Sequence, residues 1–466
     1  MHMCAAKFAL PDAVRKIGAE LASKNIAVFP VGGCVRDFLM HREPGDFDLA
    51  AQCTPKRLRA SLEEAGYRLS FEGFDFGTVC VHVGGMTVEI TCCRREEGYS
   101  DRRRPDSVAY TENIYDDLAR RDFTVNAMAY DLESDSVIDP FGGKEDIERK
   151  IIRCVGSPET RFCEDSLRVL RALRFSSTLG FELDGDTAAA VHAMHSRLSN
   201  LSGARILTEL TKLISGDGVL RVLMEYSDVI CSVIPELRAS VGFEQHNPHH
   251  IYTVYEHIAR TVASCPNRGY LRLTMLLHDM AKPYVCTVDE HGIFHFRGHP
   301  EEGARMAEVL LRRLGADRRC IGEVSHLITY HDVRPPATRA GIHKYLCSVG
   351  YAAAKELIYI RRADLSAQSP AFHDGFQYID ECERLILRLE AEGAPADVHG
   401  LMISGGDVMA AGVPSGAAVG ETLETLLGLV AEGKIPNCRR ELCDECKRIA
   451  QSLGAKEEQS AGCARK

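Results

Sequence analysis

The sequence predicts an α+β head followed by all-α domains. In the first 145 residues or so, short β-branched segments that alternate apolar and polar residues are mixed with segments of helical spacing. From about residue 145 onward, strand patterns nearly vanish and apolar residues recur at helical spacing. A chain of 466 residues is also too long for one compact core, so several domains are expected. We therefore expect a mixed β-sheet with helices in the head, and helices in the neck, body and tail.

The head begins with the pattern of an amphipathic helix over residues 11–25. The segment IAVFPVGG that follows is typical of a strand ending in a turn, and VRDFLMH has helical spacing. DFDLA, TVCVHV and MTVEITCC predict further strands of a mixed sheet, because β-branched residues alternate in them. The polar segment RREEGYSDRRRPDSVAY, residues 94–110, is expected to be a mobile loop.

The remainder is expected to be a helical array. Segments such as EDSLRVLRALRFSSTLGF, VYEHIARTVAS and EEGARMAEVLLRRLGA carry apolar residues at helical spacing. Breaks rich in Gly, Pro and Asn at EQHNPHHI, VRPPATRAG and EGAPADVHG mark candidate boundaries. The expected division is a head over 1–145, a neck over 146–240, a body over 241–370 and a tail over 371–466.

Composition indicates a soluble, cytoplasmic protein. The net charge of −10 argues against a uniformly basic surface, although a local basic cleft remains compatible with it. Eighteen cysteines are scattered through a sequence that lacks the pattern of a secretory signal, so we interpret them as reduced thiols. The apolar runs are shorter than the roughly 18 to 20 residues that a membrane span needs.

The stretch GGCVRDFLMHREPGDFDLA, residues 32–50, has the features of a site for a nucleoside triphosphate and Mg²⁺. On a strand, Asp46 and Asp48 project from one face about 7 Å apart, where they can share a pair of hard divalent cations. Glu89, on a separate predicted strand, is a candidate third ligand. The candidate phosphate contacts are two glycines, which allow close backbone approach, and one arginine: Gly32, Gly33 and Arg36.

Four motifs in one order carry a specific resemblance. GGCVRDFLMHREPGDFDLA, RRDFTVNAMAYD, DPFGGKEDIERKIIRCVG and RFCEDSLRVLRALRF fall within residues 31–175. In this order they resemble the class II tRNA nucleotidyltransferases, which comprise the CCA-adding enzymes and their poly(A) polymerase relatives. The resemblance implies that Asp46 and Asp48 hold two Mg²⁺ ions for nucleotidyl transfer. It also implies that the triphosphate and ribose are bound by Arg120, Arg121, Asp122 and Asn126.

The predicted helix EDSLRVLRALRF offers side chains for base choice. At 100° per residue, Asp165, Arg168 and Arg171 lie opposite the leucines, and Arg174 lies at the boundary. Cytosine and adenine present an amino donor beside a ring-nitrogen acceptor, whereas uracil and guanine present a carbonyl acceptor beside an N–H donor. Because an aspartate accepts and an arginine donates, Asp165 with Arg168 matches C and A. The EDxxR motif of the family has this role; the alternative is an exposed ion pair between residues three apart.

A second candidate site lies in the predicted body. VYEHIARTV, LLHDMAKP and RRADLSAQS resemble the H…HD…D signature of HD-domain metal phosphohydrolases. The resemblance implies a tetrad of mixed nitrogen and oxygen ligands, suited to a transition metal, that consists of His257, His278, Asp279 and Asp364. His299 and His331 are candidates for a second metal. The alternative is that this domain serves mainly as a scaffold.

The resemblance implies a CCA tRNA nucleotidyltransferase that transfers CMP and AMP from CTP and ATP to tRNA 3′ ends and releases pyrophosphate. The RNA is expected along the helical part, including the tail, where clusters of Arg and Lys contact its phosphates. Neither DNA nor a membrane is expected as a partner. An A-only enzyme, a poly(A) polymerase and a bifunctional enzyme with HD phosphohydrolase activity are the alternatives. In the family, the loop at the position of residues 94–108 takes part in the switch from C to A.

Overall fold

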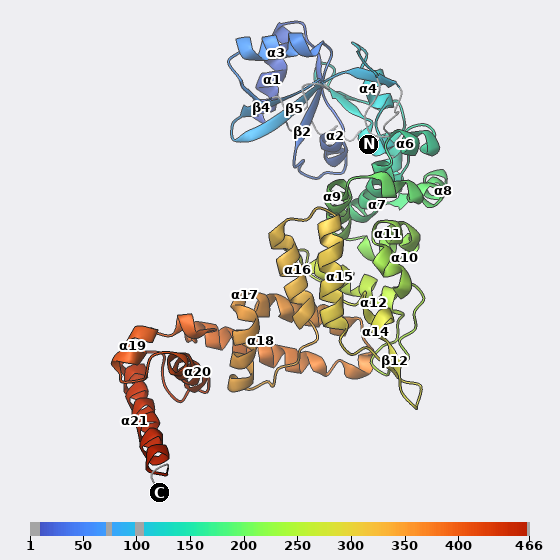
Figure 1. Cartoon of the computed structure of the whole chain (residues 1–466). Coiled ribbons are helices and arrows are strands. Elements are labelled where there is room, and N and C mark those ends of the chain that lie inside the picture. The colour runs from blue at the N-terminus through green and yellow to red at the C-terminus, as the bar shows by residue number, and fades with distance from the viewer. Residues whose placement is uncertain (1–9, 71–76, 98–106, 464–466) are drawn as a thin grey trace, which may run out of the picture. The chain divides into compact units, whose positions relative to one another are not determined.

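The computed structural model describes residues 10–70, 77–97 and 107–463. The chain divides into two compact units, Met1–Pro235 and Glu236–Lys466, and each is described by itself. The first unit contains the mixed sheet and the second consists almost entirely of helices, with one short β-ribbon (Figure 1). The predicted fold class, an α+β head followed by helical domains, is therefore confirmed.

The head is built on a five-stranded mixed sheet in the order β1-β2-β5-β4-β3. The β2–β5 pair is parallel and the other neighbouring strands run antiparallel. The register of the parallel pair places Asp48 beside Glu89. The strands are β1 (Val28–Pro30), β2 (Phe47–Ala51), β3 (Arg68–Ser70), β4 (Thr78–Val83) and β5 (Met86–Cys92).

Alternation along β2 decides which face carries the polar residues. Phe47 and Leu49 belong to the hydrophobic core that also contains the apolar faces of α1 (Asp12–Ser23) and α3 (Pro55–Glu64). Asp48 lies on the opposite face, because successive side chains of a strand point to opposite sides. The carboxylate of Asp48 is thus kept out of this core by the same alternation that buries its neighbours.

The segment expected as a loop over residues 94–110 begins and ends in paired strands. β6 (Arg94–Glu97) and β7 (Ser107–Tyr110) form an antiparallel ribbon, so the expectation of a loop is wrong for these two ends. Alternating β-branched and aromatic residues in SVAY favour the strand despite the surrounding charges. Residues 98–106, the centre of the expected loop, lie outside the described residues. The other head elements are α2 (Gly33–Leu39), α4 (Ile114–Ala119), β8 (Ala129–Asp131), β9 (Ser136–Ile138) and α5 (Gly143–Arg149).

The segment that begins at Glu164 was predicted as one continuous helix, but the helical structure is interrupted at Asp165. α6 (Pro158–Glu164) ends before Asp165, which has extended backbone angles, and α7 runs over Leu167–Leu179. Asp165 Oδ1 accepts a hydrogen bond from the backbone N–H of Leu167 at 3.1 Å, a local competitor of helical hydrogen bonding. The unit also contains β10 (Ile151–Ile152), β11 (Glu182–Leu183), α8 (Gly185–Met194), α9 (Gly203–Ile214), α10 (Val219–Glu225) and α11 (Ser227–Val233).

The second unit is helical apart from the short ribbon of β12 (Thr287–Val288) and β13 (Phe294–His295). Its longest helix, α17 (Arg339–Ser366), has a kink at Gly350, where φ is 77°. The last three helices share a separate hydrophobic core. The helices are α12 (Val254–Ser264), α13 (Leu271–Leu277), α14 (Lys282–Val285), α15 (His299–Arg313), α16 (Arg318–Tyr330), α17, α18 (Gly375–Ala391), α19 (Gly405–Ala410), α20 (Ala417–Ala431) and α21 (Arg439–Cys463).

Among the described residues, no helix is both long enough and apolar enough to cross a membrane.

Gly143 tests how closely α5 packs against the turn at Thr124. A Cβ at Gly143 would lie 2.4 Å from the carbonyl oxygen of Thr124 and 2.9 Å from Sδ of Met128. We expect Gly143→Ala to destabilise the protein by about 1–3 kcal/mol, because overpacking forces the backbone to move. Urea unfolding followed by circular dichroism measures the change.

The matched control is Gly322→Ala in α16, where a Cβ meets no atom of the described residues within 4 Å. It should be neutral or stabilise by up to about 1 kcal/mol, because alanine favours helix over glycine. If the two variants unfolded at the same urea concentration, the close packing at Gly143 would be refuted.

Candidate active site and candidate metal centre

The first unit contains a cavity of about 630 Å³ that brings most of the sequence-predicted residues together. Four elements line this cavity: the glycine turn before α2, the start of β2, the segment after α4 and the first turns of α7. Of the residues predicted for the nucleotide site, Glu89 alone does not line the cavity. The predicted residues that do are Gly32, Gly33, Arg36, Asp46, Asp48, Arg120, Arg121, Asp122, Asn126, Asp165, Arg168, Arg171 and Arg174.

Two carboxylates, Asp46 and Asp48, line the sheet end of this cavity, and a third, Glu89, lies beside Asp48 in the sheet. Asp46 immediately precedes β2, Asp48 is within it, and Glu89 is the partner of Asp48 on β5. Partial burial raises the pKa of Asp48, nearby Glu89 and Asp46 raise it further, and Arg121 opposes the shift. This mutual repulsion of oxygen ligands suits a hard divalent cation, so the carboxylates present fit Mg²⁺.

The glycine turn approaches the arginines closely. Gly32 has a φ of 73°, a conformation that favours glycine, and a Cβ there would lie 2.8 Å from Nη1 of Arg121. Arg36 Nη1 donates to Asn126 Oδ1 at 2.7 Å, which joins α2 to the second motif. Arg36 also pairs with Asp37 at 2.7 Å. The turn and the second motif therefore form one wall of the cavity.

A buried aspartate that the sequence reasoning missed orients two of the cavity arginines. Asp117, whose side chain is 1% exposed, pairs with Arg120 at 2.7 Å and with Arg121 at 3.1 Å. Both guanidinium groups lower the pKa of Asp117 against the opposing effect of burial. The spacings of three and four residues on α4 were a sequence signal for these pairs.

Asp122 is the buried partner of Arg171 rather than a free acceptor in the cavity. Its Oδ2 accepts from Arg171 Nε at 2.8 Å and from Nη2 at 2.5 Å. Burial acts to raise the pKa of Asp122, but Arg171 outweighs it and lowers the pKa to about 2. The pair connects the segment after α4 to α7.

Asp165 and Arg168 do not pair with each other, so the alternative of an ion pair three residues apart is wrong. Arg168 pairs with Glu164 at 2.5 Å, and Asp165 pairs with Arg205 of α9 at 2.8 Å. Arg174 pairs with Glu209 of α9 at 2.7 Å and lies over the ring of Phe175, 3.8 Å from its centroid. The sequence did not predict Arg205 and Glu209 as partners, because no local pattern connects α9 to α7.

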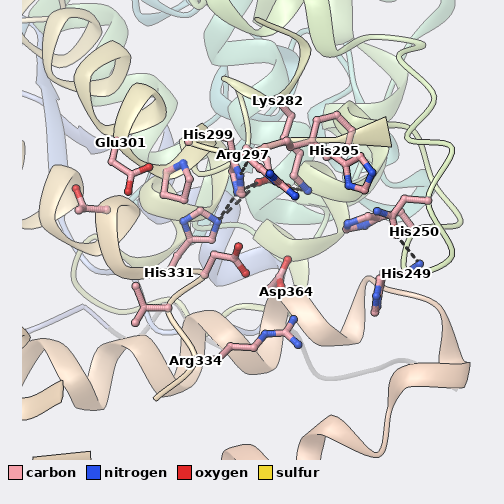
Figure 2. Close-up of a pocket in the computed structure, with 18 of the residues that line it drawn as sticks. His249, His250, Lys282, His295, Arg297, His299, Glu301, His331, Arg334 and Asp364 are labelled. Carbon is pink, nitrogen blue, oxygen red and sulfur yellow. Dashed lines mark hydrogen bonds and ion pairs between the residues drawn. The ribbon is translucent and has the colours of Figure 1, made fainter. Parts of the chain in front are cut away.

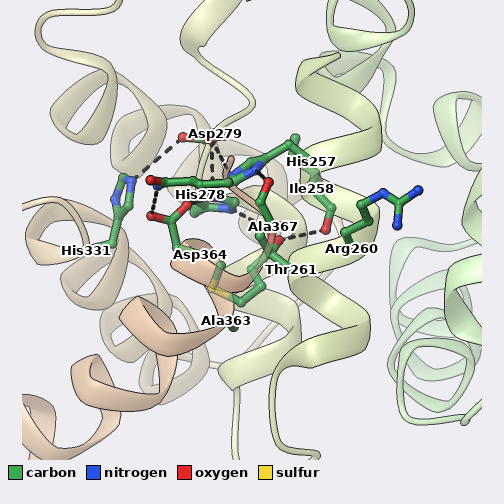
Figure 3. Close-up of polar contacts among 12 residues, drawn as sticks. His257, Ile258, Arg260, Thr261, His278, Asp279, His331, Ala363, Asp364 and Ala367 are labelled. Carbon is green, nitrogen blue, oxygen red and sulfur yellow. Dashed lines mark hydrogen bonds and ion pairs between the residues drawn. The ribbon is translucent and has the colours of Figure 1, made fainter. Parts of the chain in front are cut away.

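The second unit brings the HD-type residues together around one carboxylate. The four residues of the predicted tetrad each offer a ligand atom, and these atoms lie within 4.8 Å of one another. His257 and His278 approach Asp279 at 3.3 and 3.2 Å (Figure 3). A second group of Asp279, His299 and His331 meets the same criterion. Asp279 is therefore common to both groups and could be a ligand in either one.

The histidine tautomers make this cluster suitable for metal ions. In each of the four histidines, Nδ1 lies at 2.6–3.1 Å from a backbone carbonyl, which can only accept, so Nδ1 carries the proton and Nε2 is left as a ligand. Two of these Nε2 atoms meet the one carboxylate: His278 Nε2 lies 3.2 Å from Asp279 Oδ2, and His299 Nε2 lies 3.3 Å from Asp279 Oδ1. His299 Nε2 and His331 Nε2 face each other at 3.2 Å. Such lone pairs and carboxylates fit a cation of the transition-metal type.

A cavity of about 700 Å³ opens beside this cluster and carries several cationic side chains. Figure 2 shows Lys282, Arg297 and Arg334 around it, with His331 and Asp364 on its wall. Lys282 Nζ lies 2.7 Å from Asp279 Oδ2. Cationic side chains next to a candidate metal cluster suit an anionic ligand.

Three domain families match consecutive parts of the chain. The poly A polymerase head domain matches residues 28–153, the probable RNA and SrmB-binding site of polymerase A matches 180–239, and the HD domain matches 249–367.

The curated relatives are named CCA-adding enzyme. The protein of Oceanobacillus iheyensis is 40% identical over 209 residues, which cover 45% of this chain and 51% of the relative. That of Bacillus pumilus is 46% identical over 186 residues, which cover 40% and 45%. The matched segments thus span about half the length of these relatives.

Solved structures are similar along nearly the whole chain. The CCA-adding enzyme of Bacillus stearothermophilus in complex with CTP is 26% identical, with a TM-score of 0.70 over 95% of this chain and 98% of that one. The Thermotoga maritima CCA-adding enzyme complexed with tRNA_CCA shares the fold at 22% identity and a TM-score of 0.59, over 93% of each chain.

Fold and matched domains together define a nucleotidyltransferase-type protein that carries an HD domain. The chain contains the poly A polymerase head domain, the probable RNA-binding site of polymerase A and the HD domain, and it is similar to CCA-adding enzymes.

The ion pair of Asp122 with Arg171 predicts a specific pH dependence. Because the pKa of folded Asp122 is about 2, below the ordinary value of 3.8, its contribution to stability is present above about pH 4. That contribution is lost as the pH falls toward 2. Arg171→Met should cost about 3–5 kcal/mol at pH 7, because it leaves a buried carboxylate unpaired. The cost should shrink below about pH 4, as urea unfolding at several pH values measures.

Arg149→Met serves as the control, since Arg149 forms an exposed pair with Glu145. Its effect should stay within about 1 kcal/mol at every pH. A cost of Arg171→Met that is small, or the same at pH 7 and pH 3, contradicts the role given to this pair.

Proposed function

We propose that the protein adds CMP and AMP, from CTP and ATP, to the 3′ end of tRNA without a nucleic-acid template and releases pyrophosphate. The observation that carries the proposal is that one cavity is lined by the carboxylates before and within β2, by the arginines of the second motif and by the EDxxR residues. Support comes from the relatives named CCA-adding enzyme and from the similar structure that is described in complex with CTP.

In the proposed reaction, the carboxylates of Asp46 and Asp48 hold Mg²⁺, with Glu89 as a neighbouring charge beside Asp48. When bound, two Mg²⁺ ions supply charge neutralisation at the triphosphate and acidify the attacking hydroxyl. The RNA 3′-hydroxyl oxygen loses its proton to solvent and forms a bond to the α-phosphorus, while the bond from the α-phosphorus to the bridging oxygen breaks and pyrophosphate leaves with that oxygen. A cation held by these carboxylates would offset the mutual repulsion that helps to raise the pKa of Asp48.

The arginines that meet the turn at Gly32 and Gly33 are the proposed triphosphate contacts. Asp117 holds Arg120 and Arg121 in place, so little side-chain entropy is lost when phosphates bind. Arg36 is held through Asn126, which is proposed to contact the ribose. Asp122 acts as a positioning residue through Arg171.

We propose that Asp165 and Arg168 read the base. The contacts of Arg168 with Glu164 and with the carbonyls of Arg161 and Arg120 use three of its five N–H groups. Arg205 and the N–H of Leu167 each use one lone pair of the Asp165 carboxylate. The two side chains are thereby held in place while donors and acceptors remain for C or A. Phe175, with Arg174 over its ring, is a neighbouring surface for the base.

The remaining parts of the proposal concern the RNA. The neck over 146–240 and the tail over 371–466 are proposed to contact tRNA through arginine and lysine clusters. The reaction is proposed to take place in the cytoplasm. A-only addition is the nearest alternative, because Asp165 with Arg168 matches A as well as C.

Single-nucleotide incorporation tests this function. Purified protein is incubated with tRNA that lacks its end, or that ends in C or CC, and with one labelled nucleotide at a time. We expect C on the first two substrates and A on the third, with no U or G. Incorporation of A alone would reject CCA addition in favour of the A-only alternative.

Asp48→Asn tests the carboxylate assignment. It should reduce transfer by a factor of about 10³ or more, because a metal ligand essential to charge neutralisation is lost. Glu63→Gln, which removes an exposed carboxylate of α3, should leave transfer unchanged. Substantial activity in Asp48→Asn with an intact circular dichroism spectrum would overturn the two-metal proposal.

Arg168→Ala tests base choice separately from triphosphate binding. We expect it to reduce discrimination of CTP against UTP by about tenfold or more, an effect of about 1–3 kcal/mol. Arg36→Ala, which removes a proposed triphosphate contact, should weaken the binding of all four nucleotides to a similar extent. The ratio of kcat/KM values for CTP and UTP is the readout, and an unchanged ratio in Arg168→Ala removes the protein-template idea.

A second candidate function is metal-dependent phosphohydrolysis in the HD domain. The observation that favours it is the set of four histidines whose Nδ1 atoms are all held by backbone carbonyls, beside a cavity that also carries Lys282, Arg297 and Arg334. Purified protein should bind a transition metal and hydrolyse a 2′,3′-cyclic phosphate, and Asp279→Asn should lose both. Absence of turnover with every added metal ends this hypothesis and leaves the scaffold role.

A further inference from the structure

A buried arginine lies behind the candidate metal centre of the second unit. Arg361, on α17, is only 7% exposed. Its Nε and Nη2 are buried and have no hydrogen-bond partner among the described residues. The next residue, Arg362, differs from Arg361 because it forms ion pairs with Asp380 at 2.8 Å and with Glu383 at 2.6 Å. No carboxylate of the described residues forms an ion pair with Arg361, and a buried guanidinium without an anionic partner is costly to fold, so an anionic ligand is a reasonable partner for it.

Arg361 lines a small cavity of about 130 Å³. Its guanidinium lies over the ring of Tyr345, 5.5 Å from the centroid, and burial raises the pKa of the Tyr345 and Tyr378 hydroxyls, which the guanidinium acts to lower. Asp332 and Asp374 line the cavity as well, but both are exposed, and the described residues show no ion pair between either carboxylate and Arg361. The third carboxylate of the cavity, Asp364, pairs with His257 at 2.9 Å, so the Arg361 guanidinium and the Tyr345 hydroxyl are the donors that the buried part offers to a ligand.

The small cavity adjoins the large one beside the metal cluster. His331, Arg334 and Asp364 line both cavities. Figure 2 shows Arg334 and Asp364 on the lower wall of the larger cavity. Arg361 precedes Asp364 by three residues on α17, so the two side chains lie on the same side of the helix. A ligand can thus reach Arg361 from the metal side.

We propose that Arg361 is the anion-binding residue of a phosphate subsite behind the metal centre. The subsite binds one phosphate group, free or esterified, with Arg334 at its entrance. A tetrahedral oxyanion matches the donors of the guanidinium and of the Tyr345 hydroxyl, and its size suits the small cavity. This subsite is independent of the proposed nucleotidyl transfer and does not require that the HD domain hydrolyses anything.

Tungstate, a heavy tetrahedral oxyanion, locates the subsite directly. Crystals of the full chain are soaked in tungstate and anomalous density is measured. We expect a peak in contact with the Arg361 guanidinium, and we expect Arg361→Met to remove that peak while peaks elsewhere persist. Absence of a peak at Arg361 in the wild type overturns the proposal, whether or not tungstate binds in the other cavities.

Thermal unfolding with inorganic phosphate gives a test in solution. A ligand that binds the folded state raises the melting temperature with concentration. Arg361→Met should lose part of this phosphate-dependent increase, while its melting temperature without phosphate should equal or exceed that of the wild type. Arg361→Gln serves as a second variant, and Arg362→Met, which removes a paired arginine, should keep the full increase.

A purely structural role for Arg361 predicts the opposite pattern. Both Arg361 variants would then melt lower without phosphate and keep the full phosphate-dependent increase, which overturns the proposal. Repeating the titration with AMP distinguishes the source of the phosphate. A larger loss with AMP than with inorganic phosphate identifies an ester, and the reverse identifies the free anion. No loss with either one contradicts the subsite.

Discussion

The ion pair between Asp122 and Arg171 is the contact on which the architecture of the head cavity depends. It joins the segment after α4 to α7, two elements that face the cavity from different parts of the sequence. Buried charges are stable only when they are paired and hydrogen-bonded, so this pair fixes the distance between the two elements. Two further buried acids pair with arginines of the cavity in the same way: Asp117 with Arg120 and Arg121, and Glu209 with Arg174. The cationic groups of the cavity are therefore oriented by buried acids before any ligand arrives.

Under the proposed function, this arrangement separates two tasks within one cavity. Near the sheet, repelling carboxylates beside Gly32 and Arg121 create a place for cations and phosphates. At α7, Asp165 and Arg168 each have another protein partner and keep hydrogen-bonding capacity for a base. Preorganisation of this kind reduces the entropy lost on binding. The second unit uses different chemistry, with imidazole nitrogens around Asp279 and cationic side chains nearby.

Local patterns in the sequence predicted much of the fold and of the candidate site. Alternation in β2 and β5 and the spacing of Asp46 and Asp48 are local, and so is the helical periodicity of α7 and α12. The break at Asp165 was not predicted, because a side-chain hydrogen bond to Leu167 competes with a helical pattern that looks continuous. Arg205 and Glu209 were missed because they come from α9, and contacts so distant in sequence leave no periodic signal. Asp117 could have been found from its spacing to Arg120 and Arg121.

Binding of the four nucleoside triphosphates at equilibrium tests the central claim most directly, since it needs neither RNA nor turnover. The full chain is titrated with CTP, ATP, UTP and GTP in the presence of Mg²⁺, and the dissociation constants are compared by calorimetry. If phosphates are held at Gly32 and Arg121 while Asp165 and Arg168 read the base, CTP and ATP bind at least about tenfold more tightly than UTP and GTP. Equal affinities for all four nucleotides would contradict a cavity that selects the base with these two side chains.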